Sequence, residues 1–362
     1  MMRSLPPHMS VESGTSPSCE ANGAKDAGGI IIGIESTAHT LSFGWVDGKG
    51  IPGKSHSSFV RPKKGGIHPR EAADHHSENA ANLLKSLLGD DDFELDRVVA
   101  ISFSQGPGLG PCLRIGASIA RALSTRLDVP LLGVNHCVAH IEVGRERCKC
   151  DDPVLLYVSG GNTQIITRLD GRYRVLGETL DIGIGNMLDK FARAQGIPFP
   201  GGPRIEQLAE EYYRSEENPS LQGLELPYAV QGMDLAFSGI LNAAQHLIDK
   251  GASLPAVCWS LQEHAYAACV EVAERALAHS GKNELLLGGG VACNQRLIEM
   301  CEVMAAERGA ASFVPEKSLC IDNGSMIATL GRLHLLWGDC TSLEDSAVRQ
   351  DLRTDETEIV WN

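Results

Sequence analysis

Apolar residues recur along the chain with two different periods, and segments of the two kinds alternate. Short β-branched or aliphatic runs predict strands at residues 30–34, 41–46, 98–103, 131–134, 154–158, 164–168, 172–176, 284–287 and 311–314. Apolar residues at helical spacing predict helices at residues 70–88, 112–127, 135 onward, 187–195, 204–214, 237–250, 256–280, a segment ending at 308, and 322–337. Strands that alternate with helices form parallel βαβ units, so the pattern predicts an α/β fold.

The order of these elements restarts half-way along the chain. A strand, a glycine-rich turn and a hairpin occur near Gly33 and again near Ser159, which predicts two related lobes. We expect a disordered extension, an N-terminal lobe, a C-terminal lobe and a C-terminal tail, at residues 1–28, 29–150, 151–337 and 338–362 respectively. No apolar run reaches the ~18–20 residues of a membrane helix, so no membrane partner is expected.

Charge and cysteine content narrow the possible partners and the compartment. The chain has 32 Lys and Arg against 46 Asp and Glu, a formal net charge of −14. Such a chain binds nucleic acid poorly by bulk electrostatics, so an RNA partner needs a local basic patch or a helper subunit. The basic loop at residues 61–64 can contact phosphates, although a solvated loop is the simpler interpretation. The 11 cysteines, an odd number, suit a reducing compartment and a cytoplasmic protein.

His136 and His140 form the first candidate site. Residues four apart on a helix lie on one face, so both imidazoles can bind one metal ion. Further ligands must come from elsewhere, and Tyr157 and Asp322 are candidates. Taken alone, such a pair is more often two ordinary polar helix residues. Zinc peptidases of the HExxH type need a Glu directly after the first His, where this chain has Cys137.

Two glycine turns that follow buried strands form a second candidate site. Residues 157–161 read Tyr-Val-Ser-Gly-Gly, and residues 287–294 run from Leu-Gly-Gly-Gly to Asn294. Glycines let backbone N–H groups approach an anion closely, and a helix N-terminus favours a phosphate. Either turn alone is also explained as a tight connection. Together, in separate parts of the chain, they favour a nucleotide held between two walls.

Acidic residues and histidines near helix starts complete the candidates. Asp181 and Asp189 can accept hydrogen bonds from ribose hydroxyls, or can simply cap helices. Glu206 follows the glycine pair 201–202 and can be a first-turn acid favoured by the helix dipole. Chemistry alone assigns no role to the polar cluster at residues 68–76.

These motifs, in this order, resemble the tRNA threonylcarbamoyladenosine transferase family. The closest likeness is to its archaeal and eukaryotic branch, the catalytic subunit of the KEOPS complex, formerly described as O-sialoglycoprotein endopeptidase. The resemblance extends from about Gly33 to the terminal RTDE motif. It rests on GIESTAHT, GGIHPREAADHH, SQGPGLGPCLRIG, NHCVAHIE, YVSGGNTQ, GETLDIGIGNMLDKFAR, GGVACN and CIDNG.

The resemblance implies a two-lobe fold like those of actin, sugar kinases and heat-shock chaperones. It implies one divalent metal ion, iron or zinc, with His136, His140, Tyr157 and Asp322 as its ligands. The adenylate-binding residues it implies are Tyr157, Val158, Ser159, Gly160, Gly161, Asp189, Gly202, Glu206 and Asn294. Both sites are expected in the cleft between the lobes. The actin-like relatives use an Asp-x-Gly turn for phosphoryl transfer, and residues 159–161 lack that carboxylate.

The implied reaction transfers a threonylcarbamoyl group from threonylcarbamoyl-AMP to tRNA. The acceptor is the N6 amine of the adenosine 3′ of the anticodon, in tRNAs that read codons beginning with adenine. Expected partners are the other KEOPS subunits, including a small atypical kinase on a separate chain, and a eukaryotic member would also be nuclear. No general base is evident, and Glu71, His75 and His76 are the hypotheses. The alternatives are a metalloprotease, an actin-like ATPase and a non-catalytic tRNA-binding scaffold.

Overall fold

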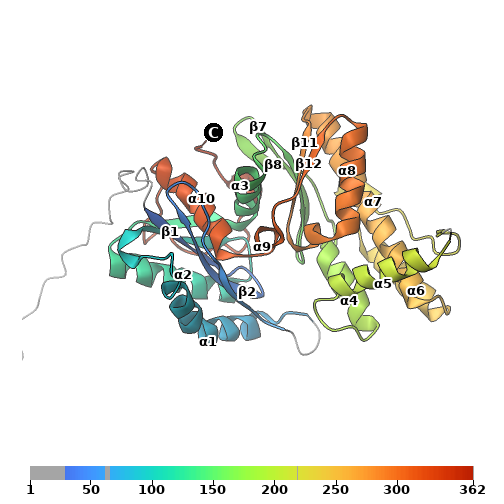
Figure 1. The fold of residues 1–362 in the computed structure, drawn as a ribbon, viewed down its shortest axis with the longest axis horizontal. Coiled ribbons are helices and arrows are strands. Elements are labelled where there is room, and N and C mark those ends of the chain that lie inside the picture. Colours follow the sequence, from blue (N-terminus) through green and yellow to red (C-terminus); the bar gives the residue numbers. More distant parts are fainter. Residues whose placement is uncertain (1–28, 62–65, 218, 362) are drawn as a thin grey trace, which may run out of the picture.

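Two five-stranded sheets form the centres of two lobes (Figure 1). The computed structural model describes residues 29–61, 66–217 and 219–361. The expected extension at residues 1–28 and most of the basic loop at residues 61–64 lie outside this part of the chain. In the described residues, no helix is long and apolar enough to cross a membrane.

The first sheet has the strand order β3-β2-β1-β4-β5. Its strands are β1 (Ile30–Glu35), β2 (Thr40–Asp47), β3 (His56–Phe59), β4 (Val98–Gly106) and β5 (Leu131–Asn135). β1 pairs antiparallel with β2 and parallel with β4, and β4 pairs parallel with β5. Alternate residues of β1 point to opposite faces. Ile30, Ile32 and Ile34 pack under α1 (Pro69–Leu88) and α2 (Gly110–Leu127), whereas Ile31 packs under α10 (Gly324–Leu336).

The second sheet repeats this arrangement, as the sequence predicts. Its order is β12-β11-β6-β7-β8, in which β6 pairs antiparallel with β7 and parallel with β11. Its strands are β6 (Val154–Val158), β7 (Thr163–Leu169), β8 (Arg172–Glu178), β11 (Glu284–Gly288) and β12 (Ala311–Phe313). The helices of this lobe are α4 (Ile184–Ala194), α5 (Gly202–Ser215), α6 (Ser238–Asp249), α7 (Leu254–Ser280) and α8 (Gln295–Glu307).

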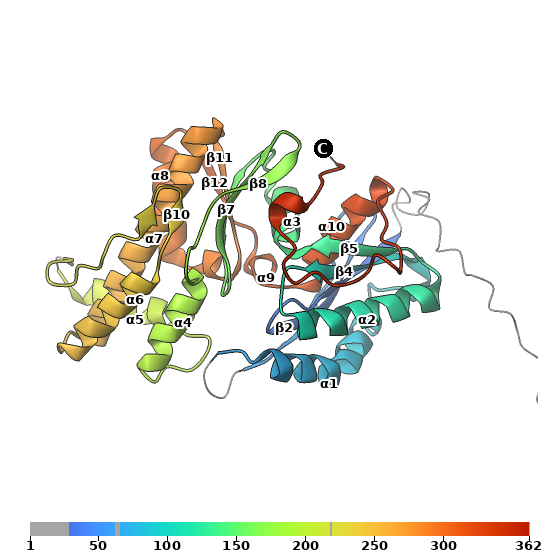
Figure 2. The same ribbon diagram turned by 180° about the vertical axis from the view of Figure 1, so that it is seen from behind.

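Helix α3 (His136–Cys148) lies between the two lobes (Figure 2). Its apolar side chains, among them Val138 and Ile141, share one buried cluster with Leu155 of β6 and with Ile327 of α10. The helix follows β5 without a loop, because Asn135 is both the last residue of that strand and the N-cap of the helix. The metal-ligand candidates on α3 are therefore held against both halves of the molecule.

Helix α10 differs from the sequence prediction in its first residue, and it packs on the first sheet. Helix α10 starts at Gly324 rather than at residue 322, because the Asn323 side chain caps it by accepting a hydrogen bond from Met326 N at 2.9 Å. The helix also covers the first sheet, where Ser102 Oγ donates to Ile327 O at 2.9 Å. Helical periodicity predicts that such a helix exists but not which sheet it covers.

The pattern also misses the shortest elements. Strand β3 has the polar sequence HSSF at a sheet edge, and the one-turn helix α9 (Lys317–Cys320) is shorter than a helical repeat. The two-stranded sheet of β9 (Val230–Gln231) and β10 (Asp234–Leu235) is likewise too short to show a period.

Candidate metal and adenylate site

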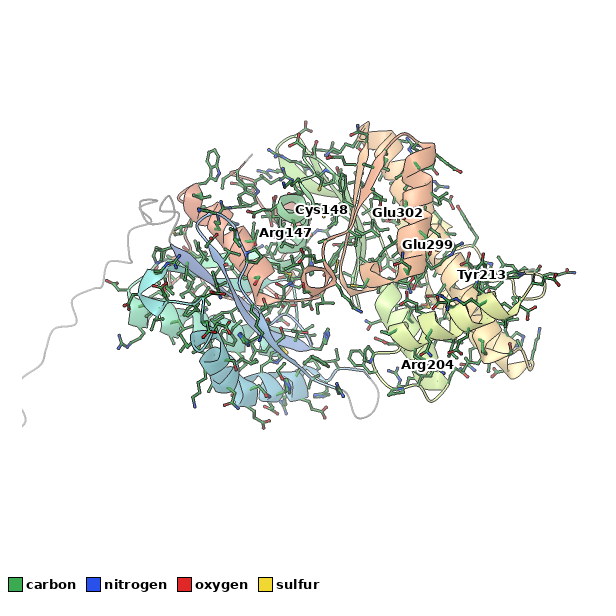
Figure 3. All side chains as sticks on the ribbon, viewed as in Figure 1. Arg147, Cys148, Arg204, Tyr213, Glu299 and Glu302 are labelled. Atoms are coloured by element: carbon green, nitrogen blue, oxygen red, sulfur yellow. The ribbon has the colours of Figure 1, made fainter. Side chains whose placement is uncertain are left out.

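The start of α3 fixes the two candidate histidine ligands. Asn135 Oδ1 accepts hydrogen bonds from Cys137 N at 2.9 Å and Val138 N at 3.2 Å, which satisfies two of the free N–H groups at the helix start. His136 and His140 follow one turn apart, with ring centroids 4.9 Å from each other. Arg147 and Cys148, at the other end of α3, lie between the lobes (Figure 3).

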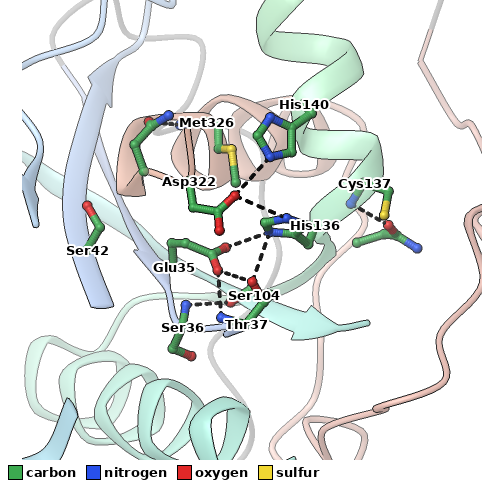
Figure 4. Close-up of polar contacts among 12 residues, drawn as sticks. Glu35, Ser36, Thr37, Ser42, Ser104, His136, Cys137, His140, Asp322 and Met326 are labelled. Carbon is green, nitrogen blue, oxygen red and sulfur yellow. Dashed lines mark hydrogen bonds and ion pairs between the residues drawn. The ribbon is translucent and has the colours of Figure 1, made fainter. Parts of the chain in front are cut away.

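Asp322 brings its carboxylate to both imidazoles (Figure 4). Asp322 Oδ1 lies 3.5 Å from His136 Nε2 and 3.3 Å from His140 Nε2. Tyr157, at the end of β6, places its hydroxyl 3.2 Å from His136 Nε2. These four side chains come from three segments far apart in the sequence, and the fold brings them together at the junction of the lobes.

The spacing of these donor atoms fits a bound metal ion. One ligand atom from each of His136, His140 and Asp322 lies within 4.8 Å of the others, and among the described residues these three alone form such a His, Cys, Asp and Glu group. Ligand atoms at ~2.1 Å from an ion in tetrahedral geometry are separated by roughly 3.4 Å. The observed separations of 3.2, 3.3 and 3.5 Å agree with that value. Nitrogen and oxygen donors suit iron and zinc equally.

Glu35, the last residue of β1, fixes the orientation of His136. Its Oε2 lies 2.9 Å from His136 Nδ1, and its side chain is fully buried. The Thr37 hydroxyl and the Thr37 N–H both donate to the other oxygen, Oε1. With Nδ1 occupied in this way, Nε2 of His136 is the nitrogen that faces Asp322.

In this site, burial and neighbouring charges shift the pKa values of His136 and Asp322 in opposite directions. Burial disfavours the charged form of His136, but the carboxylates of Glu35 and Asp322 outweigh it and raise the pKa of His136 to about 9. Burial also opposes ionisation of Asp322, yet the two histidines lower the pKa of that carboxyl below its usual range. Burial lowers the pKa of His140 and raises that of Tyr157. The ionised Asp322 carboxylate supplies negative charge for a bound cation, whereas His136 has to lose its proton before its Nε2 can bind a metal ion.

The turn after β6 lies directly beside this group. Ser159 N donates to Asn162 O at 2.8 Å, and Gly185 N at the start of α4 donates to Ser159 O at 3.1 Å. The exposed Gly160 and Gly161 lie at the tip. Close packing behind the turn requires glycine at 289, where φ is +90° and a Cβ would lie 2.4 Å from Val158 O. Both glycine turns found in the sequence therefore meet at one place.

The remaining predicted adenylate residues occupy two neighbouring points of the second lobe. Asp189 Oδ1 accepts from Gly201 N at 2.7 Å, just before Gly202 opens α5, and burial raises the pKa of Asp189. Glu206 Oε1 accepts from Gln295 N at 2.7 Å, at the start of α8. Asn294 caps that helix by accepting from Leu297 N at 3.1 Å. Each of these polar groups lies at a helix N-terminus.

Asp181 acts as a cap, one of the two interpretations that its sequence allows. Its carboxylate accepts from Phe237 N and Ser238 N, both at 2.9 Å, and from Ile182 N at 2.6 Å. It therefore holds the start of α6 and the loop before α4.

The three hypotheses for a general base occupy α1. His76 is fully buried, its Nε2 lies 3.1 Å from Ala38 O, and burial lowers its pKa to about 4. His75 contacts Ser58 Oγ at 3.1 Å, and Glu71 is exposed. His76 supports the loop between β1 and β2, and among the described residues no hydrogen bond or ion pair joins these three side chains to the metal-ligand group.

Comparison with known proteins gives the family. The family described as tRNA N6-adenosine threonylcarbamoyltransferase (TsaD) matches residues 54–329. The chain belongs to this family. A protein of that name from Archaeoglobus fulgidus is 50% identical over 333 residues, which cover 92% of this chain and all of that protein.

Some relatives of this chain are longer. A "probable bifunctional tRNA threonylcarbamoyladenosine biosynthesis protein" from Methanoculleus marisnigri is 53% identical over 333 residues. The match covers 92% of this chain and 60% of the relative, so the chain spans about three fifths of such relatives.

Solved structures confirm the two-lobe actin-like fold expected for this chain. HypF from T. kodakarensis has a TM-score of 0.58 at 17% identity, covering 89% of this chain and 49% of HypF. The activator of 2-hydroxyisocaproyl-CoA dehydratase from Clostridium difficile, solved with bound ADPNP, has a TM-score of 0.53 at 8% identity, covering 84% and 95%. At these identities the likeness concerns the fold alone.

Sequence reasoning misses two features of the candidate site. Glu35 is the last residue of β1, whose other residues are apolar or glycine. An acidic residue at the end of such a strand is the sequence signal that could have identified it. His39 lies on the next loop, and its ring contacts Phe199 of the other lobe at a centroid distance of 5.8 Å. That contact joins the two lobes, so only the folded chain reveals it.

Proposed function

We propose that this chain transfers the threonylcarbamoyl group of threonylcarbamoyl-AMP to the N6 amine of the adenosine 3′ of the anticodon in tRNA. The observation that carries the proposal is the junction of His136, His140 and Asp322 with Tyr157, directly beside the glycine turn at residues 159–161. The family match supports the same reaction. AMP and modified tRNA are the products.

The metal ion would be held by His136, His140, Asp322 and Tyr157, and is iron or zinc. When bound, it supplies a Lewis acid beside the reacting carbonyl. The chain's own residues do the positioning. The Ser159–Gly161 turn offers backbone N–H groups to the AMP phosphate, Asp189 accepts from the ribose, and Glu206 and Asn294 line the base.

Charge supports a reaction carried out inside a complex. The chain has a formal net charge of −14, so its overall charge disfavours the binding of tRNA. We therefore propose that other KEOPS subunits, including a small kinase, supply part of the tRNA contact in the cytoplasm and, in a eukaryote, in the nucleus.

Reconstitution tests the reaction against its alternatives. Purified chain, candidate partner subunits, threonylcarbamoyl-AMP and tRNA should yield the modified nucleoside, scored by mass after digestion. His136→Ala should abolish the product while the subunits still assemble, which separates catalysis from a scaffold role. Steady phosphate release from ATP without tRNA, or cleavage of a glycoprotein, in place of the nucleoside would contradict the proposal.

A further inference from the structure

The last described residues form a strap along α3, on the side of the helix away from the metal-ligand candidates. Residues 353–361, here named the C-terminal strap, begin beside the N-cap, where Asn135 Nδ2 donates to Arg353 O at 3.1 Å. Further along, Arg172 of β8 pairs with Glu358 at 3.1 Å. The strap therefore touches both the N-terminal end of α3 and the second sheet.

The strap ends on a buried carboxylate of α3. Trp361 is 2% exposed and its Nε1 donates to Glu142 Oε1 at 2.8 Å. Tyr173 of β8 donates its hydroxyl to the same oxygen, and Arg145 Nη1 lies 3.1 Å from Oε2. Glu142 is itself 4% exposed, so its charge is compensated almost wholly by these three donors.

The Trp361 ring also contacts the helix that follows Asp322. Its centroid lies 4.9 Å from that of His334 on α10. The same buried cluster contains Trp361, Ile141 of α3 and Met326 of α10. One indole thus contacts the two helices whose N-terminal ends carry the metal-ligand candidates.

Glu142 lies on the side of α3 away from those ligands. At ~100° per residue, position 142 is turned by roughly 200° from position 140. His140 faces Asp322, whereas Glu142 faces the strap. A displacement of Glu142 by its hydrogen-bond partners would therefore rotate or shift α3, and both imidazoles would move with the helix.

We propose that the C-terminal strap is a positioning element for the metal centre, with Trp361 and Glu142 as its anchor. The inference rests on the proposed metal site and adds to it residues that touch no ligand atom. Outer partners that orient metal ligands change metal affinity by about 10–100-fold. The indole N–H contacts Glu142 and not a metal ligand, so it lies one contact further from the metal than such partners. Its loss should therefore lower metal affinity by an amount at the lower end of that range.

Zinc affinity measured on folded protein tests the strap. Zn²⁺ would be titrated against a chromophoric chelator for wild type, Trp361→Phe and the control Trp337→Phe, whose ring is 57% exposed. We expect Trp361→Phe to bind Zn²⁺ about tenfold more weakly, and Trp337→Phe to stay within twofold of wild type. Phe93→Leu, a core change in the first lobe, should lower stability without moving zinc affinity. That comparison separates positioning from general stabilisation.

A milder variant covers the case in which Trp361→Phe does not fold. Tyr173→Phe removes only the hydroxyl that donates to Glu142, and its zinc affinity should fall in the same direction. If Trp361→Phe and Tyr173→Phe both bind Zn²⁺ with an affinity within twofold of wild type, the strap does not position the metal centre. That result would not contradict the metal site itself. Wild-type protein that binds neither Zn²⁺ nor Fe²⁺ would overturn the metal site, and the strap's role with it.

Discussion

At the scale of single residues, Glu35 contacts the candidate metal-ligand group through His136. It is a fully buried acid whose oxygens are shared between His136 and Thr37. The i, i+4 spacing of His136 and His140 was readable from the sequence, because one helix contains both. The Glu35–His136 contact joins positions 101 residues apart, and no local pattern encodes it.

Glu35→Gln should weaken metal binding by about 10–100-fold. The amide keeps the size of the side chain but removes the negative charge that orients and polarises His136. Chelator competition with Zn²⁺ measures the effect, and Glu71→Gln, an exposed acid on α1, is the matched control. Equal zinc affinity in Glu35→Gln and wild type would show that Glu35 has no orienting role.

Asp181 gives a pH-dependent contribution to stability. Burial raises the pKa of Asp181, but hydrogen bonds from Ser238, Ile182 and Phe237 outweigh it and lower the pKa overall. A carboxylate whose pKa is lower in the folded chain stabilises it above the unfolded value of ~3.9, and loses this effect as pH falls through the folded value. Asp181→Ala should therefore cost about 1 kcal/mol at pH 7 and much less near pH 3. Urea unfolding at both pH values measures the difference, and an equal cost at both would refute the capping role.

At the scale of elements, β1 and α10 pack against each other backbone to backbone. A Cβ on Gly33 would lie 2.1 Å from Gly324 O and 2.4 Å from Ala328 N, both backbone atoms that cannot move independently. Periodicity predicted the strand and the helix but carried no information on which sheet the helix covers. The two glycines that allow the contact lie 291 residues apart, which no window of local sequence spans.

Gly33→Ala should destabilise the fold by about 1–3 kcal/mol, because α10 must move away from β1. Gly66→Ala is the control, since a Cβ there meets nothing within 4 Å. Denaturant unfolding of the two variants compares their free energies of unfolding. A Gly33→Ala protein as stable as wild type would mean that the helix and the strand separate without cost.

At the scale of the whole molecule, the two lobes repeat one topology and enclose α3. The alternation of strands and helices was sufficient to predict this α/β architecture. The candidate metal ligands and adenylate residues were predicted largely through a family resemblance, because their segments converge only in the folded chain. For residues 353–361 only a C-terminal tail was predicted, and not its contacts with α3, since these residues have no periodic pattern.

The isolated chain should bind tRNA weakly. With a net charge of −14, it should bind no more tightly than the ~10⁻⁴–10⁻⁶ M typical of non-specific contacts at physiological salt. Fluorescence anisotropy with labelled tRNA, with and without partner subunits, measures this. Tight binding by the chain alone would mean that its own surface has a basic patch sufficient for recognition.

The central claim is that His136, His140 and Asp322 form the metal centre on which transfer depends. Metal content by elemental analysis, measured on the same preparations used for threonylcarbamoyl transfer, tests it most directly. Wild type and His246→Ala, an exposed histidine of α6, should each contain one ion per chain and modify tRNA. The double variant His136→Ala with His140→Ala should contain none and yield no modified nucleoside. Full transfer by a metal-free double variant would contradict the account.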